Sequence, residues 1–267
     1  MERVPAGVDP TVPSVARIYD YLLGGKDNFA SDRAAAEKLI ELTPNVREGV
    51  QANRRFLSRA VRLMCESGIR QFLDIGTGLP TQENVHQVAL RVAPESRIVY
   101  VDNDPIVLSH GRALLEDNPQ TIVVDGDMRN PETILDNPRV TEHLDFDKPV
   151  GLLMLAVLHF VPEDEDAERI VKTLRDRLAV GSGMAISHLS YGDLDPEKIR
   201  EGRELYKKTS AGAVTPRSHA EILRFFDGFE LVEPGLVPTE NWRPEGGEPQ
   251  LPPLPGVDGY AGVGLLR

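Results

Sequence analysis

Apolar side chains recur at helical spacing through the first 68 residues of the chain. Apolar positions three or four residues apart line one face of a helix. The pattern predicts three helices, over residues 14–23, 31–42 and 46–66. The first is followed by Gly24-Gly25, where a positive φ angle is easily adopted and a helix can end. We therefore expect residues 1–68 to form an N-terminal helical cap.

From residue 69 onward, short and fully apolar runs alternate with helical patterns. The runs predict strands at residues 71–75, 97–101, 121–124, 150–158, 182–188 and 229–232. The helical patterns between and after them cover residues 83–92, 105–117, 163–178, 196–208 and 217–226. Such alternation is typical of a parallel sheet covered by helices on both faces. Residues 69–267 are therefore predicted to form a Rossmann-like, doubly wound α/β domain, with its ligand beyond the carboxyl ends of the strands.

The C-terminal end departs from this alternation. Residues 234–256 are rich in proline and glycine and show no apolar period, and residues 260–266 then form a last apolar run. Two consecutive strands without a crossover helix pair in antiparallel fashion. We expect a mostly parallel sheet with a final antiparallel strand. The long connection is either a lid or a disordered connector, and the sequence leaves both open.

Charge and cysteine content narrow the range of partners. The chain has 42 acidic and 30 basic residues, a net charge of -12, and this field repels phosphate backbones, so nucleic acid is not expected to bind. Cys65 is the sole cysteine, and the six histidines show no metal-ligand spacing, so neither a disulfide nor a metal site is expected. No signal-peptide core and no apolar run of about 20 residues is present. These features predict a cytoplasmic protein without a membrane partner; the oligomeric state stays open.

The sharpest motif is FLDIGTGLPT at residues 72–81. An apolar strand leads into Gly76-x-Gly78 before a helix, and glycines there let the backbone turn sharply and approach a ligand. A dinucleotide-binding loop carries a third small residue at the position of Thr81, which this chain lacks. Asp74 lies beside the glycines, where a carboxylate would repel a pyrophosphate but suits a cationic amino group.

A second acid follows about 20 residues later in the chain. Asp102 ends the next predicted strand, where an acid is placed to bind ribose hydroxyls. Asp74, the glycines and Asp102 together indicate a cationic nucleoside ligand without phosphate, and S-adenosylmethionine is such a ligand. Alternatively, Asp74 caps the turn after it and Asp102 caps the helix near Pro105, although Asp104 is better placed for that cap.

These residues carry a family resemblance. Asp74-x-Gly76-x-Gly78, Asp102 and residues 125–128 (DGDM) resemble successive cofactor motifs of class I S-adenosylmethionine-dependent methyltransferases. Residues 19–29 (YDYLLGGKDNF) resemble one bacterial family of such proteins, whose substrates are not established. The resemblance covers nearly the whole chain. Pro80 replaces the third glycine of many methyltransferases but agrees with the narrower family. The resemblance implies S-adenosylmethionine as cofactor and S-adenosylhomocysteine as product.

The resemblance implies roles for the residues that match the motifs. Asp74 and the backbone of Gly76 and Gly78 would hold the methionine moiety, and Asp102 the ribose, with Asn103 beside the adenine. The other expected cofactor contacts are Asp127 to the adenine amino group, Met128 on the adenine ring, Ala156 after the fourth strand, and Lys26, Asp27 and Asn28 in a loop over the cofactor. Alternatively, residues 125–127 form an ordinary strand-end turn and residues 24–28 a plain helix-ending turn.

Two histidines are the catalytic candidates. His159 and His188 fall near the carboxyl ends of strands four and five, and either can serve as a general base, which needs a group that titrates near neutral pH. Either can equally be a structural histidine. Tyr19, Tyr21 and Tyr191 can line the acceptor site or simply pack.

The acceptor is predicted to be a small molecule. The segment from Leu155 to Pro162 is similar to that of small-molecule methyltransferases, and the Asn/Asp-Pro-Pro-Tyr/Phe motif of many amino-methylating enzymes is absent. Two other functions compete with methyl transfer. One is a sensor that binds S-adenosylmethionine or S-adenosylhomocysteine without transfer. The other is a nicotinamide-dependent oxidoreductase, disfavoured by Asp74 and Pro80-Thr81.

Overall fold

The computed structural model describes residues 8–80, 83–114, 118–190, 192, 195–245 and 259–267. Three helices precede the first strand, as the apolar spacing predicts: α1 (Val15–Leu22), α2 (Ala30–Leu42) and α3 (Val46–Glu66). Ile18 and Leu22 of α1 pack with Ala36 and Leu39 of α2 in a small apolar cluster of their own. Val50, near the start of α3, joins this cluster, whereas the rest of α3 packs on the sheet. The boundary at residue 68 stays a prediction.

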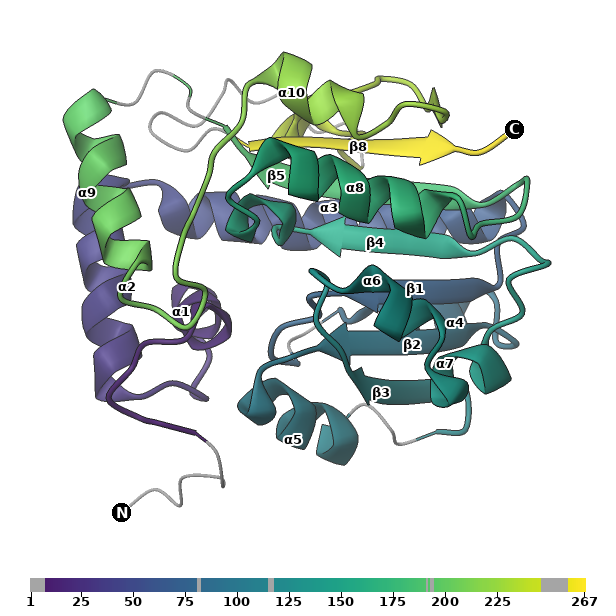
Figure 1. The fold of residues 1–267 in the computed structure, drawn as a ribbon, viewed down its shortest axis with the longest axis horizontal. Coiled ribbons are helices and arrows are strands. Elements are labelled where there is room, and N and C mark those ends of the chain that lie inside the picture. Colours follow the sequence, from purple (N-terminus) through teal and green to yellow (C-terminus); the bar gives the residue numbers. More distant parts are fainter. Residues whose placement is uncertain (1–7, 81–82, 115–117, 191, 193–194, 246–258) are drawn as a thin grey trace.

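The alternating segments build one twisted sheet in the order β3-β2-β1-β4-β5-β8-β6, with β7 also paired to β8 (Figure 1). Its five parallel strands are β1 (Gln71–Ile75), β2 (Arg97–Asp102), β3 (Thr121–Asp125), β4 (Gly151–Leu155) and β5 (Gly183–Leu189). Three strands complete the edge, β6 (Glu230–Leu231), β7 (Val237–Pro238) and β8 (Gly259–Leu265), and β8 runs antiparallel to β5, β6 and β7. The predicted Rossmann-like, mostly parallel sheet with a final antiparallel strand is confirmed.

Helices cover both faces of the sheet because successive strand residues point to opposite sides. On one face, Leu73 and Val99 pack with α6 (Pro131–Leu135), α7 (Pro138–His143), α8 (Asp164–Arg175) and α10 (His219–Arg224). On the other, Phe72 and Ile98 pack with α3, α4 (Val85–Val92) and α5 (Pro105–Leu114). The sequence pattern did not predict α6 and α7, since helices of five and six residues are too short to show a period.

Helix α9 (Pro196–Tyr206) leaves the sheet and lies beside α2, so it extends the cap from a distant part of the chain (Figure 1). Tyr206, at its end, packs against the α1–α2 cluster. The backbone N–H of Ser210, just after α9, donates to the carbonyl of Pro13 before α1. The cap is therefore built from two segments that lie far apart in the chain, which the sequence pattern did not predict.

The connection before β8 is partly ordered, contrary to a wholly disordered connector. Trp242 follows strand β7 and the turn η2 (Thr239–Asn241) and is fully buried. Its ring meets the ring of Phe56 edge to face, with the ring centroids 5.1 Å apart. This contact fixes residues 237–242 on α3. Residues 246–258 lie outside the described residues, so whether that part forms a lid stays open.

Candidate active site

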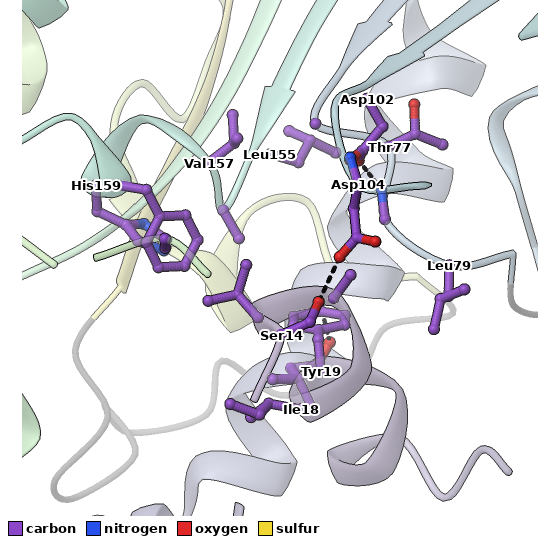
Figure 2. A pocket seen from close by; sticks show the side chains of 18 of the residues that line it. Ser14, Ile18, Tyr19, Thr77, Leu79, Asp102, Asp104, Leu155, Val157 and His159 are labelled. Carbon is purple, nitrogen blue, oxygen red and sulfur yellow. Dashed lines mark hydrogen bonds between the residues drawn. The ribbon is translucent and has the colours of Figure 1, made fainter. Parts of the chain in front are cut away.

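A cavity of about 600 Å³ lies between the cap and the carboxyl ends of the parallel strands. Figure 2 shows Ser14, Ile18 and Tyr19 of the cap opposite side chains from the strand ends. The predicted residues on the sheet all line this cavity: Asp74, Gly76, Gly78, Asp102, Asn103, Asp127, Met128, Ala156, His159 and His188. The sequence motifs therefore converge on one place, where parallel α/β sheets bind ligands.

The two glycines of the loop after β1 have different surroundings. Both adopt positive φ angles, +74° at Gly76 and +68° at Gly78, which side chains disfavour. A Cβ atom on Gly76 would lie 2.4 Å from Cγ2 of Val157, whereas a Cβ atom on Gly78 would meet nothing within 4 Å. Gly76 therefore allows β1 and the segment after β4 to approach, and Gly78 leaves its side of the loop open.

Asp102 holds this glycine loop in place. Its Oδ2 accepts a 2.9 Å hydrogen bond from the backbone N–H of Gly78, and its Oδ1 accepts one of 2.9 Å from the N–H of Asp104. Burial raises the pKa of Asp102 to about 6, despite these hydrogen bonds. The carboxylate thus joins the ends of β1 and β2 at the cavity wall.

Asp74 is the most perturbed acid of the cavity. Burial and the nearby Asp102 raise its pKa to about 7, although the neighbouring Arg54 acts in the opposite direction. Two buried carboxylates at one wall are costly unless a cation approaches them. This wall therefore fits S-adenosylmethionine, whose amino and sulfonium groups are positively charged.

Asp127 and Met128 close the adjoining wall. The guanidinium of Arg129 forks onto Asp127, with its Nε 2.9 Å from Oδ1 and its Nη2 2.5 Å from Oδ2. These hydrogen bonds hold the pKa of Asp127 below its usual value. Met128 is half-buried and packs against the core beneath it, while Asn103 is exposed. A ligand hydrogen bond to Asp127 would have to share the carboxylate with Arg129.

Ala156 has a strained backbone, with φ +53°, at the turn that follows β4. Its N–H donates to both the carbonyl (3.0 Å) and the Oγ (2.9 Å) of Ser187 on β5. Ser187 Oγ donates in turn to Oδ1 of Asn53 on α3 at 2.6 Å, and the Asn53 amide donates to the hydroxyl of Tyr19 at 2.9 Å. This series of hydrogen bonds links the cap to the turn after β4, which lies beside the glycine loop.

His188 is engaged at both ring nitrogens. Its Nε2 lies 3.0 Å from Nη1 of Arg217, and its Nδ1 lies 2.7 Å from the carbonyl of Leu189. A guanidinium only donates, so Nε2 accepts and Nδ1 carries the proton. Burial is the main reason that the pKa of His188 falls to about 4. Both nitrogens serve the structure, and this geometry favours the structural alternative for His188.

Arg217 is a residue that sequence reasoning missed. It is 1% exposed and binds side chains and carbonyls from three separate elements. Besides His188, its guanidinium donates to Asp164 of α8 and to the carbonyls of Leu158 and Val161, which flank His159. A lone arginine in a polar stretch gives no sequence signal of this role, because its partners come together only in the fold.

His159 lies in the single turn η1 (Leu158–Phe160) that Arg217 anchors. Its side chain lines the cavity, and neither ring nitrogen has a hydrogen-bond partner among the described residues. Burial, with His188 and Arg217 nearby, lowers its pKa well below the usual value. His159 is therefore a neutral, unengaged imidazole at the end of the cavity.

The predicted cap loop lies away from the cavity lining. Lys26 and Asp27 are exposed, and Asn28 is buried with its amide donating to Oδ2 of Asp20 at 2.9 Å. Asp20 also accepts from the N–H of Asp27 and so ties the loop to α1. A direct contact of these three loop residues with the cofactor stays a prediction.

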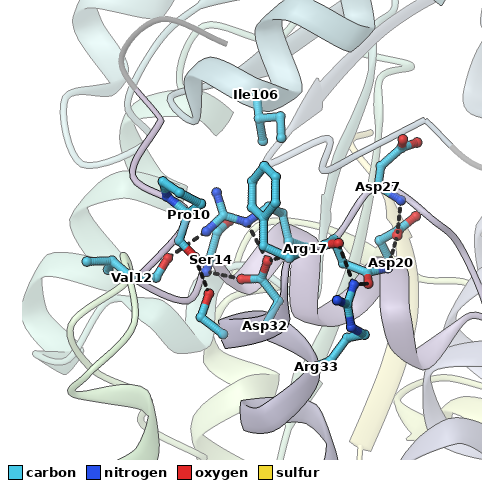
Figure 3. A network of polar contacts seen from close by, with 12 residues as sticks. Pro10, Val12, Ser14, Arg17, Asp20, Asp27, Asp32, Arg33 and Ile106 are labelled. Atoms are coloured by element: carbon cyan, nitrogen blue, oxygen red, sulfur yellow. Dashed lines mark hydrogen bonds and ion pairs between the residues drawn. The ribbon is translucent and has the colours of Figure 1, made fainter. Parts of the chain in front are cut away.

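A buried ion pair joins α1 to α2, and its arginine also holds the N-terminal segment before α1. Arg17 and Asp32 meet at 2.8 Å with 3% and 0% of their side chains exposed, and Arg17 also donates to the carbonyl of Val12 (Figure 3).

The three tyrosines considered for the acceptor site lie in different places. Tyr19 lines the cavity, Tyr21 bonds to Glu37 outside it, and Tyr191 is outside the described residues.

Comparisons with known proteins agree with this geometry. The sequence model of the S-adenosyl methyltransferase family matches residues 1–267. A search of curated proteins finds no match.

Among the described residues, each helix is too short or too polar to cross a lipid bilayer.

Two crystal structures resemble the whole chain. A candidate methyltransferase from Thermobifida fusca YX is 41% identical, with a TM-score of 0.92 over 100% of both chains. A DUF574 family protein from Streptomyces avermitilis MA-4680 is 40% identical, with a TM-score of 0.88 over 97% of this chain and 99% of the other. Human N-acetylserotonin methyltransferase, solved in complex with S-adenosylmethionine, is 15% identical, with a TM-score of 0.50 over 93% of this chain and 62% of the other, a likeness of fold.

Proposed function

Since the chain belongs to the S-adenosyl methyltransferase family and S-adenosylmethionine is the cofactor of that family, we propose that it methylates a small molecule held between the cap and the ends of β4 and β5. The observation that carries this proposal is the cavity between the cap and the strand ends, with the acids Asp74 and Asp102 at one end and His159, without a hydrogen-bond partner among the described residues, at the other. The family match also disfavours the nicotinamide-dependent alternative.

The protein's part in the reaction is mainly to bind and align. The cofactor supplies an activated methyl group on a positively charged sulfur. Asp74 with the backbone of Gly76 and Gly78, Asp102 with Asn103, and Asp127 with Met128 are the residues proposed to hold its methionine, ribose and adenine parts. The negative charge of Asp74, Asp102 and Asp127 favours a cation. The cap beside the cavity excludes water and limits the orientations of the acceptor.

His159 is the proposed general base where the acceptor carries a proton. A base must reach the proton it removes, and His159 is a cavity-lining imidazole whose nitrogens are not used by the described residues. His188 is proposed instead to position η1 through Arg217, since its own Nε2 already accepts a hydrogen bond. A lowered pKa keeps His159 unprotonated at neutral pH and able to accept a hydrogen bond, but it also makes the ring a weaker base than an ordinary histidine.

Cofactor binding is the first test, by calorimetry with S-adenosylmethionine and S-adenosylhomocysteine. Asp74→Ala is expected to weaken both by about 10- to 100-fold, because a hydrogen bond to a charged group contributes roughly 1.5–3 kcal/mol. Asp125→Ala is the matched control, since Asp125 also ends a strand but is exposed and outside the cavity. Equal effects of the two variants would remove Asp74 from the site.

Turnover is the second test. Labelled S-adenosylmethionine is incubated with the protein and a cell extract separated into small molecules and macromolecules. Label in the small-molecule fraction supports the proposal. Label only in macromolecules contradicts the acceptor class, and binding without any transfer would indicate a sensor.

A further inference from the structure

The part of the cavity away from the glycine loop has a distinct lining. We define the acceptor pocket as the walls formed by Tyr19, Val50, His159, Phe160, Leu189 and Tyr206. Its rings pack closely: His159 and Phe160 have centroids 4.4 Å apart, and Phe160 and Tyr206 are 5.8 Å apart. A pocket of this kind binds a ligand chiefly through apolar and aromatic contact.

Among the described residues, the hydrogen-bonding side chains Tyr19, Asn53 and His188 around the acceptor pocket have protein partners, whereas His159 and the Tyr206 hydroxyl do not. The Tyr19 hydroxyl lies 3.2 Å from the carbonyl of Val50 and accepts from Asn53, and Asn53 in turn accepts from Ser187. His188 is held by Arg217 and Leu189. Among the described residues neither His159 nor the Tyr206 hydroxyl has such a partner, and because Nδ1 of His159 is buried, Nε2 is the ring nitrogen that can meet a ligand. Two hydrogen-bonding groups, His159 Nε2 and the Tyr206 hydroxyl, are therefore available to an acceptor at this end.

Burial around the pocket disfavours charge of either sign. The histidines are shifted toward their neutral forms, with the pKa of His159 well below its usual value. The tyrosines are shifted toward theirs, and burial raises the pKa of Tyr206 to about 12. An ionised acceptor would meet the same penalty unless it brought a partner.

Cations at the cavity wall give an anionic acceptor little compensation. Arg17 is paired with Asp32 and Arg129 with Asp127, and Arg54 lies beside Asp74. Asp74 and Asp102, at the glycine-loop end of the cavity, would repel a negatively charged acceptor. An anion entering the cavity would have to compete with a carboxylate for each of these three arginines.

From this geometry we infer that the acceptor is an uncharged, largely aromatic molecule with one hydroxyl or ring N–H group that hydrogen-bonds to His159. This inference rests on the proposed function. In the transfer, the acceptor oxygen or nitrogen forms a bond to the methyl carbon and the carbon–sulfur bond breaks, with the electron pair staying on sulfur. The acceptor proton passes to the imidazole of His159 and then to water.

Four probes of one shape test the inference on the full chain saturated with S-adenosylhomocysteine: 2-naphthol, naphthalene, 2-naphthoate and 2-naphthylmethylammonium. Calorimetry is expected to show 2-naphthol binding tightest, with the two ions at least about 10-fold weaker, equivalent to 1.4 kcal/mol. Naphthalene is expected about 2- to 10-fold weaker, because a net neutral hydrogen bond is lost.

His159→Phe keeps a ring of similar shape and is expected to bring 2-naphthol to the affinity of naphthalene. His159→Gln retains an amide hydrogen-bonding group and is expected to recover part of the difference. S-adenosylhomocysteine affinity, unchanged within about twofold, verifies that each variant is folded. Tighter binding of either ion, an unaltered 2-naphthol affinity in His159→Phe, or no binding of any probe would overturn the inference.

The same proteins separate this inference from the proposed function, with S-adenosylmethionine in place of S-adenosylhomocysteine where methylation is assayed. Failure of the wild-type protein to bind S-adenosylhomocysteine would defeat the proposed function before any probe is added. Conversely, the expected order of probe affinities without methylation of 2-naphthol would leave the pocket's chemistry standing and count against transfer to this hydroxyl.

Discussion

Ser14 Oγ donates a 2.6 Å hydrogen bond to Oδ2 of Asp104, joining residues that lie 90 positions apart in the chain (Figure 2). Asp104 also accepts from the N–H of Ile106 and caps α5. Ser14 is in turn fixed by its own N–H, which donates to Asp32. The start of α1 is thereby fastened to the segment that follows β2, at the side of the cavity where Asp102 lies.

Removing this link should release the cofactor faster. In Ser14→Ala we expect the dissociation rate of S-adenosylhomocysteine to rise by about 3- to 10-fold, since roughly 1 kcal/mol of bonding between arm and sheet is lost. Stopped-flow displacement measures the rate. Thr11→Ala is the control, because the Thr11 hydroxyl bonds only within the arm, to Asp9. Equal rates in the two variants would show that the link does not retain the cofactor.

The two loop glycines should respond differently to alanine. Gly76→Ala places a methyl group against Val157 and is expected to destabilise the fold by more than the roughly 1 kcal/mol cost of a positive φ angle. Gly78→Ala meets no neighbour and is expected to cost only that strain, while its methyl group weakens cofactor binding. Thermal unfolding and calorimetry on both variants test this pairing, which equal losses of stability would contradict.

Asp74→Asn should stabilise the protein without cofactor at alkaline pH. Between pH 3.8 and about 7 the folded state retains a proton on Asp74 that the unfolded state has lost, so this group lowers the free energy of unfolding as the pH rises. The neutral amide removes the penalty. Its advantage over wild type is expected to be near zero at pH 4 and to reach about 2–4 kcal/mol at pH 8.

Denaturant unfolding of both proteins at pH 4, 6 and 8 measures this difference. Asp125→Asn serves as the control, because Asp125 is exposed at the end of β3. A difference that is constant with pH would mean that Asp74 does not carry the raised pKa. The same Asp74 substitution should weaken S-adenosylmethionine binding at pH 8, so stability and function change in opposite directions.

His188 should remain neutral and protonated on Nδ1 down to about pH 4. Between that pH and its ordinary pKa of 6.5, the unfolded state binds a proton that the folded state excludes, so this group makes stability rise with pH. In Arg217→Met the donor to Nε2 and the nearby positive charge are lost, and the pKa of His188 is expected to rise.

Long-range ¹H–¹⁵N spectra of the histidine rings report both the tautomer and its titration. Arg217→Lys keeps the charge but not the guanidinium fork, so the pKa should change less than in Arg217→Met. Both variants are expected to lose stability by about 3–5 kcal/mol, because Leu158 and Val161 lose buried partners. A wild-type His188 protonated on Nε2 would contradict the hydrogen-bond assignment.

The sequence by itself determined the sheet and the wall of the cavity that carries Asp74 and Asp102. Short apolar runs and glycine turns are local features, so β1 with Gly76 and Gly78 could be placed from the order of residues alone. Asp74 and Asp102 lie near the ends of two such strands, and parallel strands bring their carboxyl ends to one edge. The final antiparallel strand followed from the missing crossover helix.

Only the tertiary structure decided how the remaining polar groups are used. The pairs Arg217–His188 and Ser14–Asp104 join residues that are far apart in sequence, and neither has a local pattern. Burial, which lowers the pKa of both His159 and His188, also depends on all the elements packed around each ring. Hydrogen-bond partners and desolvation are properties of three-dimensional neighbours, whereas the order of residues specifies directly only the neighbours along the chain.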